Sequence, residues 1–313
     1  MKITDTSDLW WKTAVIYCLD VETYMDGNDD GVGDFEGLAR RIDYLADLGI
    51  TCLWLMPFYP SPDRDDGYDI SDFYGIDPRL GNHGDFVEVI RTARDRGMRV
   101  IVDLVVNHTS DKHPWFVSAR RSRTSAHRDF YVWRDAPPKK QQPTVFPGEE
   151  ASVWEYDERT EQYFQHVFYK HQPDLNIANP RVRDEIAKTI GFWLALGVSG
   201  FRIDAVPFLI EPPDGVELGD PHEFLRDLKR FLQHASAMPR CSERSTSPSG
   251  SSCSSSAASA AASSTCSSTS CRCRRCTSRS CGAIPHHSSS PSRHARPCRR
   301  RRRGRTSFAT TMS

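Results

Sequence analysis

The sequence predicts an α/β protein in which strand–helix units build a parallel sheet, and three observations support this class. Short β-branched apolar runs alternate with amphipathic helical stretches between residues 10 and 233. Residues 1–240 are rich in aromatic and aliphatic side chains, enough for a sizeable core. The last apolar run carries Arg202 and Asp204, which lie two residues apart and so face the same side of a strand. Alone, this pair could be either a core ion pair or part of a site.

The first three units follow one another in order. We predict a buried strand at residues 13–17, a helix that Asp34 caps and that runs through Leu48 with its apolar residues on one stripe, and a strand at 51–56. A helix at 85–96 then precedes a third strand at 99–106. Parallel strands joined by helices bring their carboxyl ends to one edge of the sheet, so chemistry is expected in the residues that follow each strand.

Two such residues are Asn107 and His108, which follow the third apolar run. The strand–helix rhythm then fails over residues 109–171, a segment rich in Trp, Tyr, Arg and Pro that is too long for an ordinary connection, so we predict an inserted subdomain. The rhythm returns with a helix after Pro180, the strand that carries the two charges, and a last helix at 222–233. The sequence thus contains four strand–helix units.

A loop rich in Asp, Asn and Gly follows the first strand. Oxygen-bearing groups recur there at alternate positions, with Gly31 at the sharp turn, as in calcium-binding loops. The candidate ligands are Asp26, Asn28, Asp30, the carbonyl of Val32, and Asp34. Gly37 stands where an EF-hand requires a bidentate Glu, so the loop is not an EF-hand, and residues of these types also form ordinary turns. We predict a structural calcium ion here and no organic cofactor.

The net charge of zero hides two parts of opposite sign. Residues 241–313 contain 13 Arg, 23 Ser and one acid, Glu243, whereas residues 1–240 contain 28 Lys+Arg and 40 Asp+Glu. Eight of the ten cysteines also lie in the second part, which leaves Cys18 and Cys52 in the first. The second part cannot form a core, and it could be a basic arm for nucleic acid, a cysteine cluster for metal, or a segment read in a shifted frame.

Several short motifs together resemble the signatures of the α-amylase superfamily of retaining glycoside hydrolases and transferases. They are DLVVNH at 103–108, QPDLN at 172–176, GFRID at 200–204 and GYDISD at 67–72. The segments most similar to its maltose-isomerising branch, the trehalose synthases, lie at 64–70, 113–116, 129–133 and 204–207, although related α-glucosidases share much of this pattern. The resemblance covers residues 10 to about 233 and implies a (β/α)8 barrel.

On that family's plan the chain would hold the N-terminal half of the barrel. The expected domains are the first three units at 1–108, subdomain B at 109–171, the fourth unit with the nucleophile strand at 172–234, and a disordered, non-native Ser/Arg-rich tail at 235–313. Half a barrel would leave two open sheet edges, which are prone to aggregate.

The resemblance also implies roles for the polar residues at the strand ends. Asp204 would attack the anomeric carbon of the sugar to form a glycosyl-enzyme, and Arg202 would keep the Asp204 carboxylate ionised. Asp103 would brace the end of its strand. The implied glucose-binding residues are Tyr68, which would stack on the ring, and Asp66, Asn107, His108, Phe168 and Gln172. Each of these residues, taken singly, could instead be a core or packing residue.

A retaining glycosidase needs a second carboxylic acid about 5 Å from its nucleophile. The family carries it as a Glu on the fifth strand, and the written sequence has no counterpart. Starting each codon of the tail one base earlier, however, permits RLGDAPVLGEVNV from residues 235–247 and NFVRNHDE from 306–313, which resemble the missing signatures. We therefore expect a frameshift between Gln233 and Ala235.

The resemblance therefore implies a glucosyl enzyme that converts maltose to trehalose with retention, or an α-glucosidase that passes the same intermediate to water. Without its acid the chain as written would be inactive, and a pseudogene product or sugar-binding remnant is the alternative of another class. The N-terminus lacks the apolar region of a signal peptide, and no apolar run could span a bilayer. We expect a cytoplasmic protein that binds maltose or related α-glucosides and neither nucleic acid nor membrane; the oligomeric state stays open.

Overall fold

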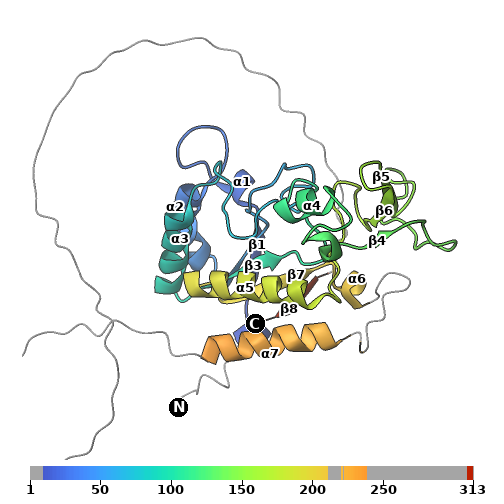
Figure 1. Cartoon of the computed structure of the whole chain (residues 1–313). Coiled ribbons are helices and arrows are strands. Elements are labelled where there is room, and N and C mark those ends of the chain that lie inside the picture. Colours follow the sequence, from blue (N-terminus) through green and yellow to red (C-terminus); the bar gives the residue numbers. More distant parts are fainter. Residues whose placement is uncertain (1–9, 211–219, 221, 238–308, 313) are drawn as a thin grey trace, which may run out of the picture. The chain divides into compact units, whose positions relative to one another are not determined.

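The computed structural model describes residues 10–210, 220, 222–237 and 309–312 (Figure 1). All of these residues belong to one compact unit, whose main feature is a largely parallel sheet.

The main sheet contains four parallel strands and one antiparallel strand among the described residues. In spatial order they are β1 (Ile16–Leu19), β2 (Cys52–Leu55), β3 (Arg99–Leu104), β7 (Gly200–Asp204) and β8 (Ala309–Met312). The first four pair in parallel, and β8 pairs antiparallel with β7. The predicted α/β class with parallel strand–helix units is thereby confirmed.

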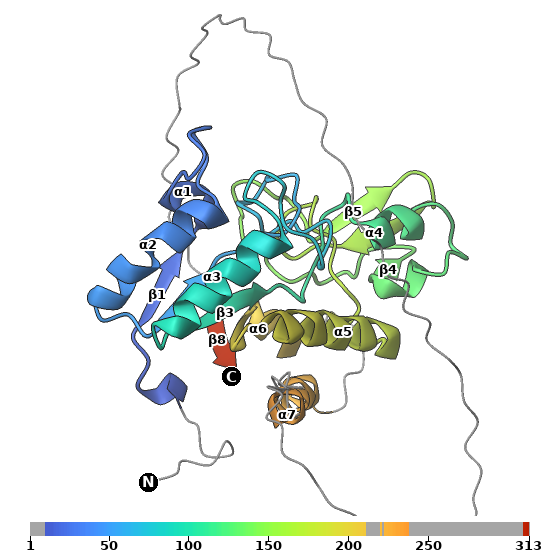
Figure 2. The same ribbon diagram turned by 90° about the vertical axis from the view of Figure 1, so that its left-hand side faces the viewer.

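Helices connect the parallel strands. The longer ones are α2 (Phe35–Asp47), α3 (His83–Asp95), α5 (Pro180–Leu196) and α7 (Glu223–Ala237). The shorter ones are α1 (Val21–Tyr24), α4 (Pro114–Ala119) and α6 (Val206–Ile210), with the 3-10 turns η2 (Trp10–Lys12) and η3 (Arg128–Phe130). Helix α2 packs beside α3, and α5 beside α7 (Figures 1 and 2). No described helix is long and apolar enough to cross a membrane.

Local sequence explains where these helices begin and end. The side chain of Asp34 accepts a hydrogen bond from the backbone N–H of Gly37 at 2.6 Å, which caps α2. Asn82 and Asp85 form a capping box at the start of α3. Helix α5 ends at Leu196 and is capped by Gly197, whose φ of 109° is one that residues with a side chain rarely adopt.

The strand register divides the side chains of the sheet between two faces. Trp54 pairs with Ile101, and Asp103 pairs with Arg202, so these residues and Asp204 share one face. The residues between them face the opposite side, where they are buried in one apolar cluster with residues of α2, α3 and α5. From the strands this cluster takes Leu53, Leu55, Val100, Val102, Leu104, Phe201 and Ile203.

The segment between β3 and α5 contains a second, smaller sheet. Its strands are β4 (Trp133–Arg134), β5 (Trp154–Asp157) and β6 (Gln162–Gln165), paired antiparallel in the order β4-β6-β5. An isolated bridge between His108 and Asp174 ties the end of this inserted segment to the carboxyl end of β3. The inserted segment therefore packs next to the strand ends that carry the candidate site.

The first strand differs from its prediction. β1 covers Ile16–Leu19 rather than 13–17, and Val15 and Ile16 are 52% and 41% exposed. An apolar run of this kind is typical of a buried strand, but β1 lies at one end of the described sheet. Its outer edge therefore has no neighbouring strand among the described residues, and only Leu19 of its four residues is buried.

The segment predicted to be a disordered tail contributes to the fold at two places. Helix α7 continues to Ala237, and residues 309–312 form β8. β8 adds to the edge of β7, where unpaired backbone groups offer hydrogen bonds to another strand. The other residues of 235–313 lie outside the described residues, so the expected non-native tail stays a prediction.

Candidate active site

Asp204 is the last residue of β7 and lies at the carboxyl end of the sheet. Its side chain is 14% exposed, so it is largely buried but can be reached. Ala205 follows with a φ of 56°, in the left-handed region that alanine rarely adopts, and α6 begins directly after it. This sharp turn ends the strand immediately after the carboxylate.

Arg202 joins two carboxylates through one nitrogen. Its Nη1 lies 2.5 Å from Oδ1 of Asp103 and 3.0 Å from Oδ1 of Asp204. The side chains of Arg202 and Asp103 are 1% and 0% exposed. The other guanidinium nitrogens, Nε and Nη2, are buried and have no hydrogen-bond partner among the described residues. Arg202 therefore holds Asp204 in place, and its Nε and Nη2 groups can still donate hydrogen bonds to a further partner.

Burial dominates the electrostatics of this group. It raises the pKa of Asp103 to about 7, although Arg202 and the indole of Trp54 both favour the charged form. Burial would also lower the pKa of Arg202, but its neighbours, Asp103 first, keep it above its ordinary value. Arg202 therefore stays charged, whereas Asp103 can gain or lose a proton near neutral pH.

Tyr68 reaches the same group from the loop after β2. Arg202 donates a hydrogen bond to its hydroxyl at 3.2 Å, and the guanidinium lies 6.0 Å from the centre of the Tyr68 ring. Asp66, which is exposed, and Gly67 precede it with φ values of 46° and 84°. A Cβ at Gly67 would lie 2.7 Å from the carbonyl oxygen of Pro57, so this turn requires glycine. The turn at Asp66 and Gly67 thus directs Tyr68 toward Arg202.

His108 and Phe168 lie against each other, with ring centres 5.1 Å apart. His108 is 2% exposed, and burial lowers its pKa to about 3, so its ring is neutral at physiological pH. Phe168 also contacts Phe208 of α6, at 5.2 Å between ring centres. These rings connect the inserted segment to the turn that follows Asp204.

Asn107 and Gln172 make contacts that the sequence did not predict. The amide of Asn107 donates a hydrogen bond to Oδ1 of Asp174 at 3.0 Å. Gln172 is fully buried and donates to Oδ2 of Asp65, in the loop after β2, at 2.9 Å. Both side chains therefore fasten the inserted segment to the strand ends, rather than pairing with the arginine.

Trp54 and Asp174 belong to this region, although sequence reasoning missed them. The indole Nε1 of Trp54 donates to Oδ2 of Asp103 at 2.8 Å, and Oδ2 of Asp174 accepts from the backbone N–H of Val167 at 3.0 Å. A feature of the sequence could have indicated each of these two residues. Trp54 carries a donor inside an apolar strand, and Asp174 is the acid within the QPDLN motif.

In the predicted calcium loop, side-chain oxygens accept hydrogen bonds from backbone N–H groups of the loop itself. Oδ1 of Asp26 accepts from the N–H groups of Asn28 and Asp29, and Oδ1 of Asp30 accepts from that of Val32. Among the described residues, no group of three or more His, Cys, Asp or Glu side chains is arranged to hold a metal ion. The donors in the loop are nevertheless all oxygens, the type that calcium takes, so the ion stays a prediction.

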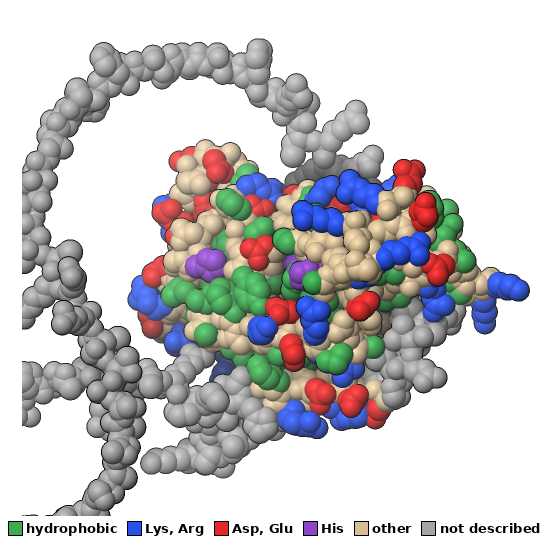
Figure 3. Space-filling view, viewed as in Figure 1, with side chains coloured by type: hydrophobic (Ala, Val, Ile, Leu, Met, Phe, Trp, Pro, Cys, Tyr) green, Lys and Arg blue, Asp and Glu red, His purple; other side chains and the backbone are tan. Residues whose placement is uncertain are grey.

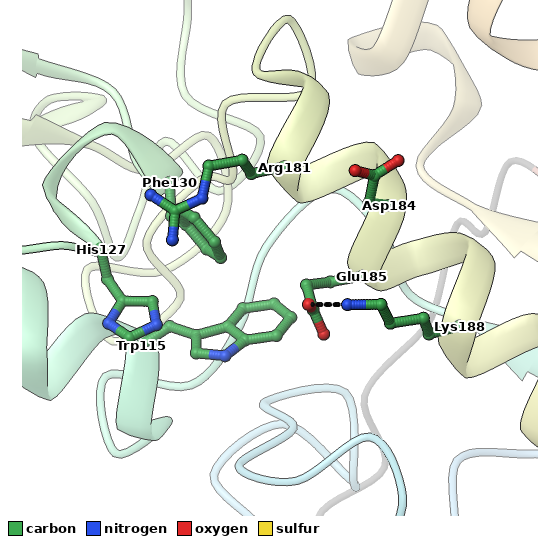
Figure 4. A pocket seen from close by; sticks show the side chains of 7 residues that line it. All are labelled: Trp115, His127, Phe130, Arg181, Asp184, Glu185 and Lys188. Atoms are coloured by element: carbon green, nitrogen blue, oxygen red, sulfur yellow. Dashed lines mark hydrogen bonds and ion pairs between the residues drawn. The ribbon is translucent and has the colours of Figure 1, made fainter.

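A separate pocket of about 380 Å³ lies between the inserted segment and α5 (Figure 4). Its lining residues are Trp115, His127, Phe130, Arg181, Asp184, Glu185 and Lys188. Arg181 covers the ring of Phe130 and donates to the carbonyl of Ala126, while Lys188 pairs with Glu185 at 2.7 Å, so both cations are already engaged. None of the candidate active-site residues lines this pocket.

On the face shown in Figure 3, acidic and basic side chains are intermixed.

Comparisons with known proteins agree with the motifs. The family model for the alpha amylase catalytic domain matches residues 19–249. A trehalose synthase from Pimelobacter sp. (strain R48) is 46% identical over 226 residues, which are 71% of this chain and 39% of that protein. An oligo-1,6-glucosidase from Parageobacillus thermoglucosidasius is 40% identical over 244 residues, with 71% of this chain and 43% of that protein covered.

A solved structure shares the fold. The crystal structure of trehalose-6-phosphate hydrolase from Bacillus licheniformis superposes with a TM-score of 0.66 at 36% identity, over 72% of this chain and 43% of that one. The chain thus spans less than half the length of these relatives. The residues matched by the family model contain the parallel strands β2, β3 and β7, the inserted segment and the arginine–carboxylate group. The chain therefore belongs to the alpha-amylase family of retaining glycosidases and transferases, and it holds the N-terminal part of that family's barrel.

Proposed function

We propose that this chain supplies the nucleophile half of a retaining α-glucoside active site, of the kind that converts maltose to trehalose. The observation that carries the proposal is the buried bridge from Asp103 through Arg202 to Asp204, which holds a reachable carboxylate at a strand end. The Arg202 nitrogens without partners among the described residues fit a site that is completed by further groups. The similarity to a trehalose synthase supports the maltose reaction.

In the first step Asp204 attacks the anomeric carbon of the α-glucoside. A bond forms between a carboxylate oxygen and that carbon, the bond to the leaving oxygen breaks, and the leaving oxygen takes a proton from a general acid. In the second step a hydroxyl of the released glucose attacks the same carbon, the bond to the Asp204 oxygen breaks, and the hydroxyl proton passes to the deprotonated general acid. The two inversions together retain the configuration, and trehalose forms when the attacking group is the anomeric hydroxyl.

The surrounding residues would bind and orient the sugar. Tyr68 would stack on the glucose ring, and the neutral His108 would exchange hydrogen bonds with a sugar hydroxyl, with Phe168 closing the apolar side. Asn107 and Gln172 would act through the contacts that fasten the inserted segment beside the strand ends. The exposed Asp66 stands on the turn before the stacking ring and would meet the sugar from there.

The general acid is the group that the written sequence does not supply. We infer a frameshift between Gln233 and Ala235, since a one-base shift permits sequences that resemble the family's missing signatures. The chain as written would then react only with glucosides whose leaving group needs no proton, and it would leave maltose unchanged. Resequencing the DNA over codons 230–245 tests this inference. An extra or missing base supports it, and an intact frame with maltose turnover contradicts it.

The nucleophile can be tested without the acid by using 5-fluoro-α-D-glucopyranosyl fluoride, because fluoride leaves without being protonated. The carbon–fluorine bond breaks as the bond to the Asp204 oxygen forms, and the fluorine on the ring slows hydrolysis of the product. Intact-mass measurements should show one 5-fluoroglucosyl adduct on the parent chain and none on Asp204→Asn. Asp220→Asn is the matched control, since Asp220 is an exposed carboxylate that pairs with Arg226. A folded parent chain that stays unlabelled contradicts the proposal.

Hydrolysis of short α-glucosides is the second candidate, because an oligo-1,6-glucosidase and a trehalose-6-phosphate hydrolase are also similar to this chain. Water would then replace glucose as the acceptor of the same intermediate. A product assay on the frame-restored protein separates the two reactions. Trehalose from maltose favours the isomerase, and glucose alone favours the hydrolase. Maltose binding without any covalent label would indicate a sugar-binding remnant.

We further propose a structural calcium ion in the loop after β1 and a cytoplasmic location. Asp26, Asn28, Asp30, Val32 and Asp34 would supply oxygen ligands to the ion and so order the loop. Cys52 is a buried free thiol, which fits a reducing compartment.

A further inference from the structure

We propose that Trp54 is a positioning residue of this site, which holds Asp103 and Arg202 in the geometry that places Arg202 against Asp204. The inference rests on the proposed function and assigns a task to a residue that acts through its neighbours. Trp54 lies on β2, where it pairs with Ile101 of β3. Asp103 lies two residues beyond that partner and so faces the same side of the sheet.

Two contacts of the indole converge on the ion pair. Nε1 donates to Oδ2 of Asp103 at 2.8 Å, while the other carboxylate oxygen, Oδ1, contacts Arg202 at 2.5 Å. The guanidinium of Arg202 lies over the ring of Trp54, 4.8 Å from its centre. One side chain thus holds the anion through its polar edge and the cation through its face.

The two contacts of Trp54 matter because the guanidinium of Arg202 could adopt more than one orientation toward the two carboxylates. Its Nη1 serves both Asp103 and Asp204, whereas Nε and Nη2 are buried without a hydrogen-bond partner among the described residues. Without the indole donor, the carboxylate of Asp103 can rotate about its Cβ–Cγ bond, and the guanidinium can turn with it. A hydrogen bond from a rigid ring fixes the carboxylate plane. The approach of Arg202 to Asp204 therefore depends on a residue two strands away.

A tryptophan that only fills space would not need its N–H group, so removing the donor alone separates the two roles. Trp54→Phe keeps an aromatic ring and loses the donor. Trp133→Phe is the matched control, because the Trp133 indole donates to the carbonyl of Arg128 at 3.0 Å and the Arg128 guanidinium lies 3.3 Å from its ring centre. Each variant thus loses one indole donor beside an arginine, and only the first touches the candidate site.

The first measurement requires no reaction. Indole N–H signals are followed by ¹⁵N-resolved NMR from pH 5 to pH 9, and the Trp54 signal is assigned by its disappearance in Trp54→Phe. Burial raises the pKa of Asp103 to about 7, so the Trp54 signal should titrate with that midpoint. It should stop titrating in Asp103→Asn. The indole signal should also shift in Asp103→Asn, and a Trp54 signal that neither titrates in the parent chain nor shifts in that variant overturns the proposed contact.

The second measurement is the rate at which 5-fluoro-α-D-glucopyranosyl fluoride labels Asp204 as a function of pH. Trp54→Phe should slow labelling about tenfold at pH 7, the size expected for one lost charge-assisted hydrogen bond. It should also move the acid-side fall in rate to higher pH, since losing the donor raises the pKa of Asp103. Trp133→Phe should change neither property.

The outcomes separate the two proposals. Equal rates and equal pH profiles for Trp54→Phe and the parent chain refute the positioning role. A parent chain that takes no label refutes the proposed function, and the indole titration then still decides whether Trp54 holds Asp103. Circular dichroism of each variant confirms that the proteins compared are folded.

Discussion

Replacing Asp103 with Asn isolates what one buried carboxyl contributes to stability. In the folded chain, burial raises the pKa of Asp103 from 3.8 to about 7. A group whose pKa is higher when folded holds its proton more tightly in the folded state. Its stabilising contribution is therefore fully present below about pH 4 and is lost as the pH rises to about 7. At about 1.4 kcal/mol per pKa unit, this loss is on the order of 4 kcal/mol.

The Asn variant keeps the shape and lacks the titrating proton. Its amide nitrogen would face a donor, either Nη1 of Arg202 or the indole of Trp54, because both partners of Asp103 donate hydrogen bonds. At low pH the protonated carboxyl also turns one donor, its O–H group, toward one of these partners, so the two chains should differ by no more than about 1 kcal/mol. As the pH rises, the parent chain should lose stability relative to the variant, by up to ~4 kcal/mol.

Urea unfolding followed by circular dichroism across pH 4–8 measures both free energies. Asp227→Asn is the control, since Asp227 pairs with Arg230 on an exposed face of α7 and such pairs contribute little. A parent chain whose advantage over the Asp103 variant grows with pH would refute this reasoning. It would mean that the attraction of Arg202 outweighs the cost of burying the charged carboxylate.

Three further changes test the fold and the predicted metal loop. Asp34→Ala removes the cap of α2 and should lower the free energy of unfolding by about 1–2 kcal/mol. Glu36→Ala, on the exposed face of the same helix, should change that free energy by less than about 0.5 kcal/mol. Equal effects of the two substitutions would show that Asp34 does not act as the cap. Saturating calcium should raise the melting temperature of the parent chain and not that of Asp26→Asn, and an equal response of the two would place the ion elsewhere. Ile16→Thr should reduce self-association in sedimentation experiments, because Ile16 is 41% exposed on the edge strand β1, and an unchanged mass distribution would show that this edge is not the contact.

Features set by local pattern could be predicted from the sequence. Strands β2, β3 and β7 lie within the predicted apolar runs, and Asp34 caps α2 where its sequence position indicates. The alternation of side chains along a strand placed Arg202 and Asp204 on one face, and the structure brings them into contact. These features depend on residues a few positions apart, whose geometry the backbone fixes.

Contacts between distant segments could not be predicted in the same way. Trp54 and Asp103 are 49 residues apart, and Asn107 and Asp174 are 67 apart. Spacing within one element does not show which strand lies next to it or where an inserted segment packs. The exposure of Val15 has the same origin, because burial of an apolar strand depends on a neighbour that its own sequence does not contain.

Locating the glucosyl adduct decides whether Asp204 is the nucleophile of an α-glucoside site. After treatment with 5-fluoro-α-D-glucopyranosyl fluoride, tandem mass spectrometry of peptides should place a single adduct on Asp204 and none on the neighbouring Asp103. An adduct on another carboxylate, or a folded chain that carries none, would contradict the assignment.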